Sequence, residues 1–171
     1  MGFQLSLAPR VLGQESPVSI RPKEGDLLVK VGDTGATPLT PDDVPVGGMQ
    51  TMAWAMDPAD KTLRSGSRLN RVLLVRFDPD KLSPETRTRA ADGVVAYSAI
   101  CTHNGCEVTE WISDQQLLFC PCHDSKFAPK DGGSVVDGPA PRMLPALPLK
   151  LVDRKLVVAK PFTARITFEP A

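Results

Sequence analysis

The sequence predicts an all-β domain, built as an antiparallel β-sandwich or barrel, on three observations. Short apolar stretches recur along the chain at the length of single strands. Turns rich in Gly and Pro separate them, and the chain holds 17 Pro and 13 Gly. Only Pro84–Ala91 has helix signals, with Ser83 as the N-cap and Pro84 at the first position. Many short strands with little helix are typical of sandwiches and barrels.

Each apolar stretch predicts one strand. The expected strands are Asp26–Val31, Gln50–Met56, Arg71–Phe77, Gly93–Ser98, Leu117–Cys120, Leu147–Val152, Lys155–Ala159 and Thr163–Phe168. Residues 1–25 contain Pro9, Pro17 and Pro22, which predicts an extended arm that wraps the core or a partner. The length of 171 residues, with 42% hydrophobic and 23% charged residues, suits one domain covering residues 1–171.

The balance of charges argues against one class of partner. Lys+Arg and Asp+Glu both number 20, so the net charge is zero, and aromatic residues make up only 5% of the chain. A nucleic-acid-binding surface would need a basic patch and stacking aromatic residues. No apolar run reaches the roughly 18 residues that span a bilayer, and the start, MGFQLSLAPR, lacks the features of a secretory signal. We therefore expect no nucleic-acid partner and no transmembrane segment in this chain.

For four arginines and two tryptophans we expect structural rather than functional roles. Four arginines are expected to be solvated or to lie at strand edges: Arg64, Arg68, Arg71 and Arg76. Trp54 and Trp111 are expected to pack in the core or at its rim.

The histidines and cysteines of the chain are clustered. The chain has two His and four Cys, and all six lie between Cys101 and His123. They form two short groups, CTHNGC at Cys101–Cys106 and CPCH at Cys120–His123. Each group offers a cysteine and a histidine within a few residues, so each loop can supply two metal ligands. This pattern predicts a metal centre.

Three kinds of metal centre compete for these ligands. Zinc bound by two Cys and two His is chemically allowed, and a copper site with thiol and imidazole ligands would need a different ligand set. Zinc fingers place two Cys together and then two His, whereas each loop here mixes the two residue types. Mixed loops match a [2Fe–2S] centre in which two His replace two Cys on one iron. A structural zinc module stays open as the non-redox alternative.

The two groups are similar to the cluster-binding boxes of the high-potential Rieske proteins. CTHNGC at Cys101–Cys106 and CPCHDS at Cys120–Ser125 carry this resemblance. Gly138–Pro141, with the sequence GPAP, looks like the proline-rich loop that covers the cluster in that family. The resemblance covers about Ser98–Leu149. It implies the Rieske fold, in which a small cluster-binding subdomain, here residues 98–149, is inserted into an antiparallel base.

The resemblance assigns the ligands of one Rieske-type [2Fe–2S] cluster. Cys101 and Cys120 would bind the inner iron as thiolates, and His103 and His123 would bind the outer iron near the surface. With two thiolates and two neutral imidazoles, the oxidised centre carries no net charge, so adding an electron is less opposed than in a four-thiolate cluster. Rieske centres accordingly have potentials of about −150 to +300 mV, against roughly −400 mV for plant-type ferredoxins.

Four further positions follow from the resemblance. Cys106 and Cys122 match the disulfide that links the two loops. Ser125 matches a serine whose hydroxyl hydrogen-bonds a bridging sulfide. Phe127 stands where the highest-potential members have a tyrosine that donates to a cysteine sulfur. Phenylalanine cannot donate, so we expect a potential below that of the most oxidising Rieske centres and above that of the dioxygenase type.

The implied function is one-electron transfer, without substrate chemistry of the chain's own. It would serve as an electron-transfer protein or as a subunit of a periplasmic or membrane-associated oxidoreductase complex, with a cytochrome or a catalytic subunit as partner. The alternative is the Rieske subunit of a quinol:cytochrome c oxidoreductase with its anchor removed, which would add quinol as a partner. Asn104 weakens that alternative, because an apolar residue usually follows the first histidine there. The disulfide implies the periplasm or an equivalent oxidising compartment.

Overall fold

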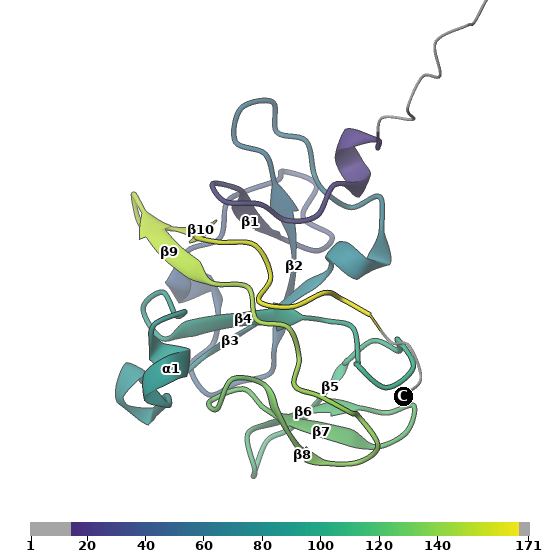
Figure 1. The fold of residues 1–171 in the computed structure, drawn as a ribbon. Helices are drawn as coiled ribbons and strands as arrows, with labels where there is room; N and C mark the ends of the chain where they lie inside the picture. Colours follow the sequence, from purple (N-terminus) through teal and green to yellow (C-terminus); the bar gives the residue numbers. More distant parts are fainter. Residues whose placement is uncertain (1–14, 168–171) are drawn as a thin grey trace, which may run out of the picture.

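The computed structural model describes residues 15–167, which form two antiparallel sheets and little helix. The strands are β1 Leu27–Lys30, β2 Thr51–Met56, β3 Val72–Arg76, β4 Val94–Ser98, β5 Glu110–Ile112, β6 Leu117–Cys120, β7 Ser125–Ala128, β8 Ser134–Asp137, β9 Leu149–Val152 and β10 Lys155–Val158. The short helices are η1 Pro17–Ser19, η2 Pro41–Asp43, η3 Arg68–Asn70, η4 Pro79–Lys81 and α1 Pro84–Arg87. The all-β prediction is confirmed (Figure 1).

The larger sheet is the base of the molecule. Its strand order is β4-β3-β2-β1-β10-β9, and all the pairings are antiparallel. The segment before β9 also pairs back onto β4, through the Tyr97–Ala146 bridge and the bond from Leu147 N to Ala96 O (2.9 Å). The two ends of the sheet therefore approach each other, and the base curls toward a barrel.

The smaller sheet is a meander in the order β5-β6-β7-β8, inserted between β4 and β9. In Figure 1 it lies beside the end of β4, away from β1. The turn between β6 and β7 is the second Cys/His group itself, since Cys120 pairs with Ser125 across it. Asp124 has φ of 63°, in the left-handed region, which closes this turn. The inserted small sheet agrees with the architecture that the resemblance implied.

Strand β3 joins the packing of the two sheets. Its residues from Val72 to Val75 are all buried, and they alternate between two hydrophobic clusters. Leu73 and Val75 pack in the cluster that contains Cys101, Cys120 and Phe127. The other two residues of this stretch, on the opposite face, pack in the core of the base. The small sheet therefore has no separate core and is supported by the base.

The predicted elements differ from the structure in three places. Strands β5, β7 and β8 were not predicted, because each is short and contains charged or exposed residues. The helix ends at Arg87 rather than Ala91, although Ser83 caps it and Pro84 opens it as expected. The strand expected at Thr163–Phe168 is wrong for residues 163–167, because Thr163 contacts Ala146 by single hydrogen bonds rather than a ladder. Phe168 and residues 1–14 of the expected arm lie outside the described residues.

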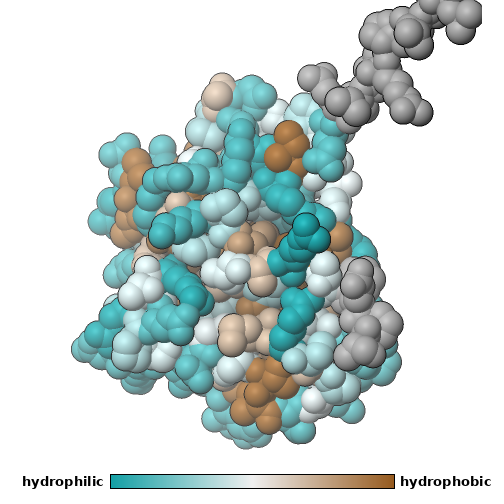
Figure 2. Space-filling model, in the orientation of Figure 1, coloured by the Kyte–Doolittle hydropathy of each residue, from teal (hydrophilic) through white to brown (hydrophobic). Residues whose placement is uncertain are grey.

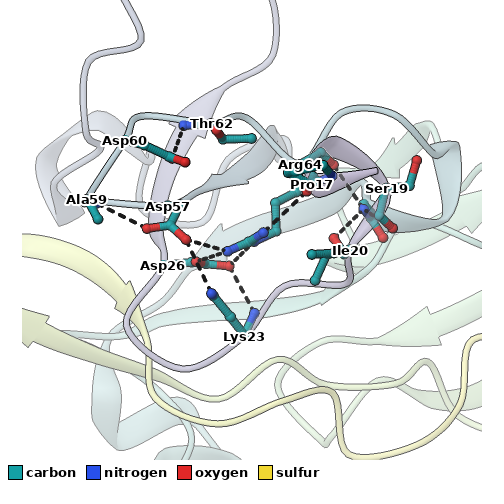
Figure 3. Close-up of polar contacts among 11 residues, drawn as sticks. Pro17, Ser19, Ile20, Lys23, Asp26, Asp57, Ala59, Asp60, Thr62 and Arg64 are labelled. Atoms are coloured by element: carbon teal, nitrogen blue, oxygen red, sulfur yellow. Dashed lines mark hydrogen bonds and ion pairs between the residues drawn. The ribbon is translucent and has the colours of Figure 1, made fainter. Parts of the chain in front are cut away.

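The expectation that Arg64 is solvated is wrong. Arg64 is 1% exposed, and its guanidinium donates to both carboxylate oxygens of Asp26, at 2.5 and 2.8 Å. Figure 3 shows this guanidinium lying between Asp26, Asp57 and Pro17. Asp26 is itself fully buried, so the pair compensates two charges that would otherwise be isolated in the interior.

Trp111 packs at the rim of the core as expected, and Trp54 is half-buried. The ring of Trp111 packs at 6.4 Å from that of Phe77, at the rim of the shared hydrophobic cluster. The guanidinium of Arg71 lies 4.9 Å above the ring of Trp54.

Between residues 15 and 167, no helix is long and apolar enough to cross a membrane.

Candidate metal centre

Two loops at the end of the small sheet carry the Cys/His residues. The first, Cys101–Cys106, follows β4 and closes on itself, with Cys101 N donating to Cys106 O (2.7 Å) and Gly105 N to Cys101 O (3.1 Å). Gly105 has φ of +74°, which a glycine adopts without strain. The second loop, 121–124, is the turn between β6 and β7.

The structure places the four expected ligands in two pairs, one of thiols and one of imidazoles. Cys101 and Cys120 are free thiols, each 1% exposed, in the hydrophobic cluster beneath the loops. The rings of His103 and His123 lie with their centroids 4.6 Å apart and nearly perpendicular. His103 is half-buried and His123 is exposed. The site thus has two thiols on the inside and two imidazoles toward the surface.

The two thiols interact with each other. A hydrogen bond from Cys120 to the Cys101 sulfur lowers the pKa of Cys101 to about 6. The same contact, together with burial, raises the pKa of Cys120 above its ordinary value. Two sulfurs this close in a buried place are stable with one negative charge and disfavour two, unless a cation compensates them. A metal bound by both thiolates supplies that compensation.

The arrangement fits a [2Fe–2S] cluster with a divided ligand set. Among the residues that the structure describes, the Nδ1 atom of His103 is one of few buried polar side-chain atoms without a hydrogen-bond partner. A buried imidazole nitrogen without a partner is costly unless it binds something. A metal ion next to it would satisfy this nitrogen. Thiolates on one side and imidazoles on the other are the ligands that the two irons of a Rieske centre take.

A disulfide joins the two loops. It links Cys106 and Cys122, which are 16 residues apart in the sequence. This is the pair that the resemblance implied. Because Cys106 ends the first loop and Cys122 precedes His123, the bond fixes the two ligand-bearing loops relative to each other.

The proline-rich loop and the residue that follows it make hydrogen bonds to the two Cys/His loops. Ser125 is buried, and its hydroxyl accepts a hydrogen bond from Ala140 N (3.1 Å). A hydrogen bond from the same hydroxyl to the Cys101 sulfur helps to lower the pKa of that thiol. Thr102, between the first two ligands, donates from its Oγ1 to Arg142 O (2.6 Å). The loop is therefore attached to both cluster-binding loops.

Sequence reasoning missed two residues that hold these loops. Thr102 is a polar residue buried between two ligands, and its place inside the motif was the only available signal. Arg68 donates from Nη1 to the carbonyl of Gly105 (2.5 Å). It precedes Gly105 by 37 residues, so no local pattern could have connected it to the site. Phe127 is fully buried in the same hydrophobic cluster as Cys101 and Cys120.

Comparisons with known proteins match this chain to Rieske proteins. A family profile described as "Rieske [2Fe-2S] domain" matches residues 56–148. The sequence is 33% identical over 132 residues to the cytochrome bc1 complex Rieske iron-sulfur subunit of Streptomyces lividans, covering 76% of each chain. It is 40% identical over 97 residues to a Haloferax mediterranei protein named as a candidate Rieske subunit of respiratory nitrate reductase, covering 56% of this chain and 43% of that one.

Among solved structures, the soluble domain of Rieske protein II from Sulfolobus acidocaldarius is similar, with 24% identity and a TM-score of 0.42. That match covers 57% of this chain and 66% of the other. The chain spans three-quarters of the Streptomyces protein but less than half of the Haloferax protein.

Proposed function

The chain belongs to the Rieske [2Fe–2S] domain family, and on this premise we propose which of its residues hold the cluster. Cys101 and Cys120 bind the buried iron as thiolates, and His103 and His123 bind the outer iron. The family match decides against the structural zinc module left open by the sequence. Residues 1–171 are taken as one domain, in which residues 98–149 form the cluster-binding part.

The function of the domain is one-electron transfer through one [2Fe–2S] cluster. The cluster supplies a site that gains or loses a single electron at high potential, because its oxidised state is neutral. The protein's part is to bind, orient and shield. The two buried thiols keep water from one side, while the exposed ring of His123 gives an electron partner access on the other.

Ser125 raises the reduction potential of the cluster by a hydrogen bond, whereas Phe127 cannot make such a bond. The Ser125 hydroxyl bonds toward the sulfur side of the site, where a hydrogen bond stabilises the added negative charge and raises the potential. Phe127 lies in the hydrophobic cluster that contains the two thiols, and its side chain has no hydrogen-bond donor. The potential therefore lies below that of the most oxidising Rieske centres and above that of the dioxygenase type.

The partner is a redox protein, either a cytochrome or the catalytic subunit of an oxidoreductase. Two relatives are named as subunits of the cytochrome bc1 complex and of a respiratory nitrate reductase, which supports a place in such a complex. Asn104 is exposed beside the first histidine, and its polarity disfavours an apolar quinone pocket. The disulfide supports the periplasm or an equivalent oxidising compartment as the location.

Two observations carry the ligand proposal: two buried thiols interact with each other, and two imidazole rings face each other, one of them with a buried nitrogen that has no hydrogen-bond partner. Its test is metal and acid-labile sulfide analysis of the purified chain, with EPR after reduction. We expect about two irons and two sulfides per chain and a Rieske-type EPR signal. His103→Cys and His123→Cys should each abolish the Rieske signal, because the outer iron would lose one of its two imidazole ligands. Zinc at one ion per chain without sulfide would overturn the assignment.

A further inference from the structure

We propose that Arg68 is a positioning residue for the first cluster loop and that the docked N-terminal arm holds Arg68 in place. The arm is defined here as residues 16–25, and the turn that contacts it is residues 66–71. Gly66 and Asn70 of this short turn contact the arm, whereas Arg68 and Arg71 contact the loop between Cys101 and Glu107. The inference rests on the ligand set proposed above.

The arm is attached to the turn by buried polar groups. Asn70 is fully buried, and its Nδ2 donates to the carbonyls of Ile20 (2.8 Å) and Arg64 (3.0 Å). Its Oδ1 accepts from the Arg21 guanidinium (2.7 Å). Gly66 N donates to the carbonyl of Val18 (2.8 Å). A buried amide with this many partners is expensive to displace, so residues 18–21 of the arm are fixed against the turn.

Two other contacts extend this attachment. Arg64 lies beneath the arm, paired with Asp26 at its end and donating to Pro17 O (3.4 Å) near its start (Figure 3). Gly66 also approaches the arm closely. A Cβ on Gly66 would lie 2.7 Å from Val18 Cγ2 and 2.8 Å from Ser19 Oγ. The backbone carbon of Val18 would lie 3.0 Å from the same Cβ, so any side chain at Gly66 requires residues 18 and 19 of the arm to shift.

The same turn contacts the first cluster loop. Arg68 donates to Gly105 O (2.5 Å), and Gly105 N donates in turn to the carbonyl of Cys101, a proposed ligand. Arg71, at the end of the turn, pairs with Glu107 at 2.6 Å, and its own carbonyl accepts from Ala99 N (3.0 Å). The loop is thus held at both ends by residues from the turn.

These contacts have two consequences for the cluster. The bond to Gly105 O restricts the backbone between Cys101 and Cys106, on which His103 stands. The guanidinium also brings a positive charge to this loop, and a positive charge near a redox centre favours its reduced state. Displacing the arm moves the turn, so the arm and the potential of the cluster are coupled through Arg68.

The test compares Arg68→Gln with Arg154→Gln in the cluster-loaded protein. Arg154 is an exposed arginine in the turn between β9 and β10, and it pairs with Asp42 of η2. Arg154→Gln therefore changes the net charge by the same amount as Arg68→Gln. Protein-film voltammetry should show about a threefold smaller equilibrium constant for reduction in Arg68→Gln, a downward shift of about 28 mV at 59 mV per decade. Arg154→Gln should leave the potential unchanged. Equal shifts in the two variants would overturn the role of Arg68.

A second readout separates positioning from charge. Amide hydrogen exchange across residues 101–106 should be faster in Arg68→Gln than in the wild type and should be largely restored in Arg68→Lys. Unchanged exchange in Arg68→Gln would contradict the positioning role.

The role of the arm is tested with Gly66→Ala, which displaces Val18 and Ser19. It should lower the potential when Arg68 is present and have no further effect in Arg68→Gln, because both changes act through one contact. Arg21→Gln, which removes one donor to Asn70, is the milder second variant. Additive shifts would refute the coupling. A wild-type protein without a Rieske EPR signal would instead refute the ligand set, which keeps the two failures distinct.

Discussion

Replacing Gly138 with alanine should detach the proline-rich loop from the cluster-binding turn. Gly138 opens that loop with φ of +87°, and its Cα faces the backbone of the turn. A Cβ there would lie 2.5 Å from Ser125 Cα, 2.7 Å from Asp124 O and 2.8 Å from Ser125 N. These neighbours are backbone atoms, so no flexible side chain can move away to make room.

The cost can be worked out from these distances. Ordinary van der Waals contact begins near 3.4 Å, so the loop must move by about 1 Å. The same movement would lengthen the 3.1 Å bond from Ala140 N to Ser125 Oγ beyond hydrogen-bonding distance. Leaving that buried N–H unpaired costs about 1–3 kcal/mol. The left-handed backbone of an alanine adds about 1–2 kcal/mol, so the total loss of stability is about 2–5 kcal/mol.

Gly132→Ala is the matched control. Gly132 has φ of +66°, but the nearest atom to its Cβ would be Thr86 Oγ1 at 4.0 Å. Gly132→Ala should therefore lose only the stability of about 1–2 kcal/mol that a left-handed alanine costs, because its Cβ overlaps no neighbouring atom. Urea denaturation of both variants measures the difference, and the decay of the cluster's visible absorption under a chelator measures its protection. Gly138→Ala should lose more stability and release the cluster faster. Equal behaviour of the two alanine variants would refute the reasoning.

Three other substitutions probe the site and its support. Ser125→Ala should lower the reduction potential, because the hydroxyl that bonds to the Cys101 sulfur is lost; voltammetry giving an equal or higher potential would contradict this. Phe127→Tyr should raise the potential if the new hydroxyl donates to a thiolate, and the accompanying change in EPR g-values distinguishes this from a general loosening. Arg64→Ala should cost about 3–5 kcal/mol of unfolding free energy, since Asp26 is left as an unpaired buried charge. A loss below about 1 kcal/mol in urea denaturation would show that water reaches Asp26.

How far the sequence predicts the fold depends on how each strand is buried. The run RVLLVRF gave β3 to within one residue at each end, because both faces of that strand are buried and its sequence is continuously apolar. Strands β7 and β8 carry exposed or charged residues on one face, such as Lys126 and Asp137, which pair with each other across the ladder. Four residues are too few for an alternating pattern to stand out.

The candidate site divides in a similar way. The four proposed ligands and the disulfide partners lie in two short segments, so the motif alone predicts them. The structure places the two thiols together and the two imidazole rings together, and it joins Cys106 to Cys122. The residues that support the site come from distant parts of the chain. Arg64 meets Asp26 across 38 residues, and Arg68 meets Gly105 across 37. Charge alone predicts that Arg64 is solvated, whereas its buried partner Asp26, far away in the sequence, places it in the interior. Arg68 is exposed as expected, but its bond to Gly105 O could not be predicted from charge.

The supports of the cluster loops share one property that bears on electron transfer. The bonds from Arg68 to Gly105 O, from Thr102 to Arg142 O and from Ala140 N to Ser125 Oγ all hold backbone positions rather than side-chain ends alone. With the disulfide, they fix the shape of the loops from three sides independently of any partner protein. Groups held in advance need little rearrangement when charge changes at the site. Such surroundings favour one-electron transfer, because the rearrangement of the ligands and of their environment between the two oxidation states contributes to the barrier.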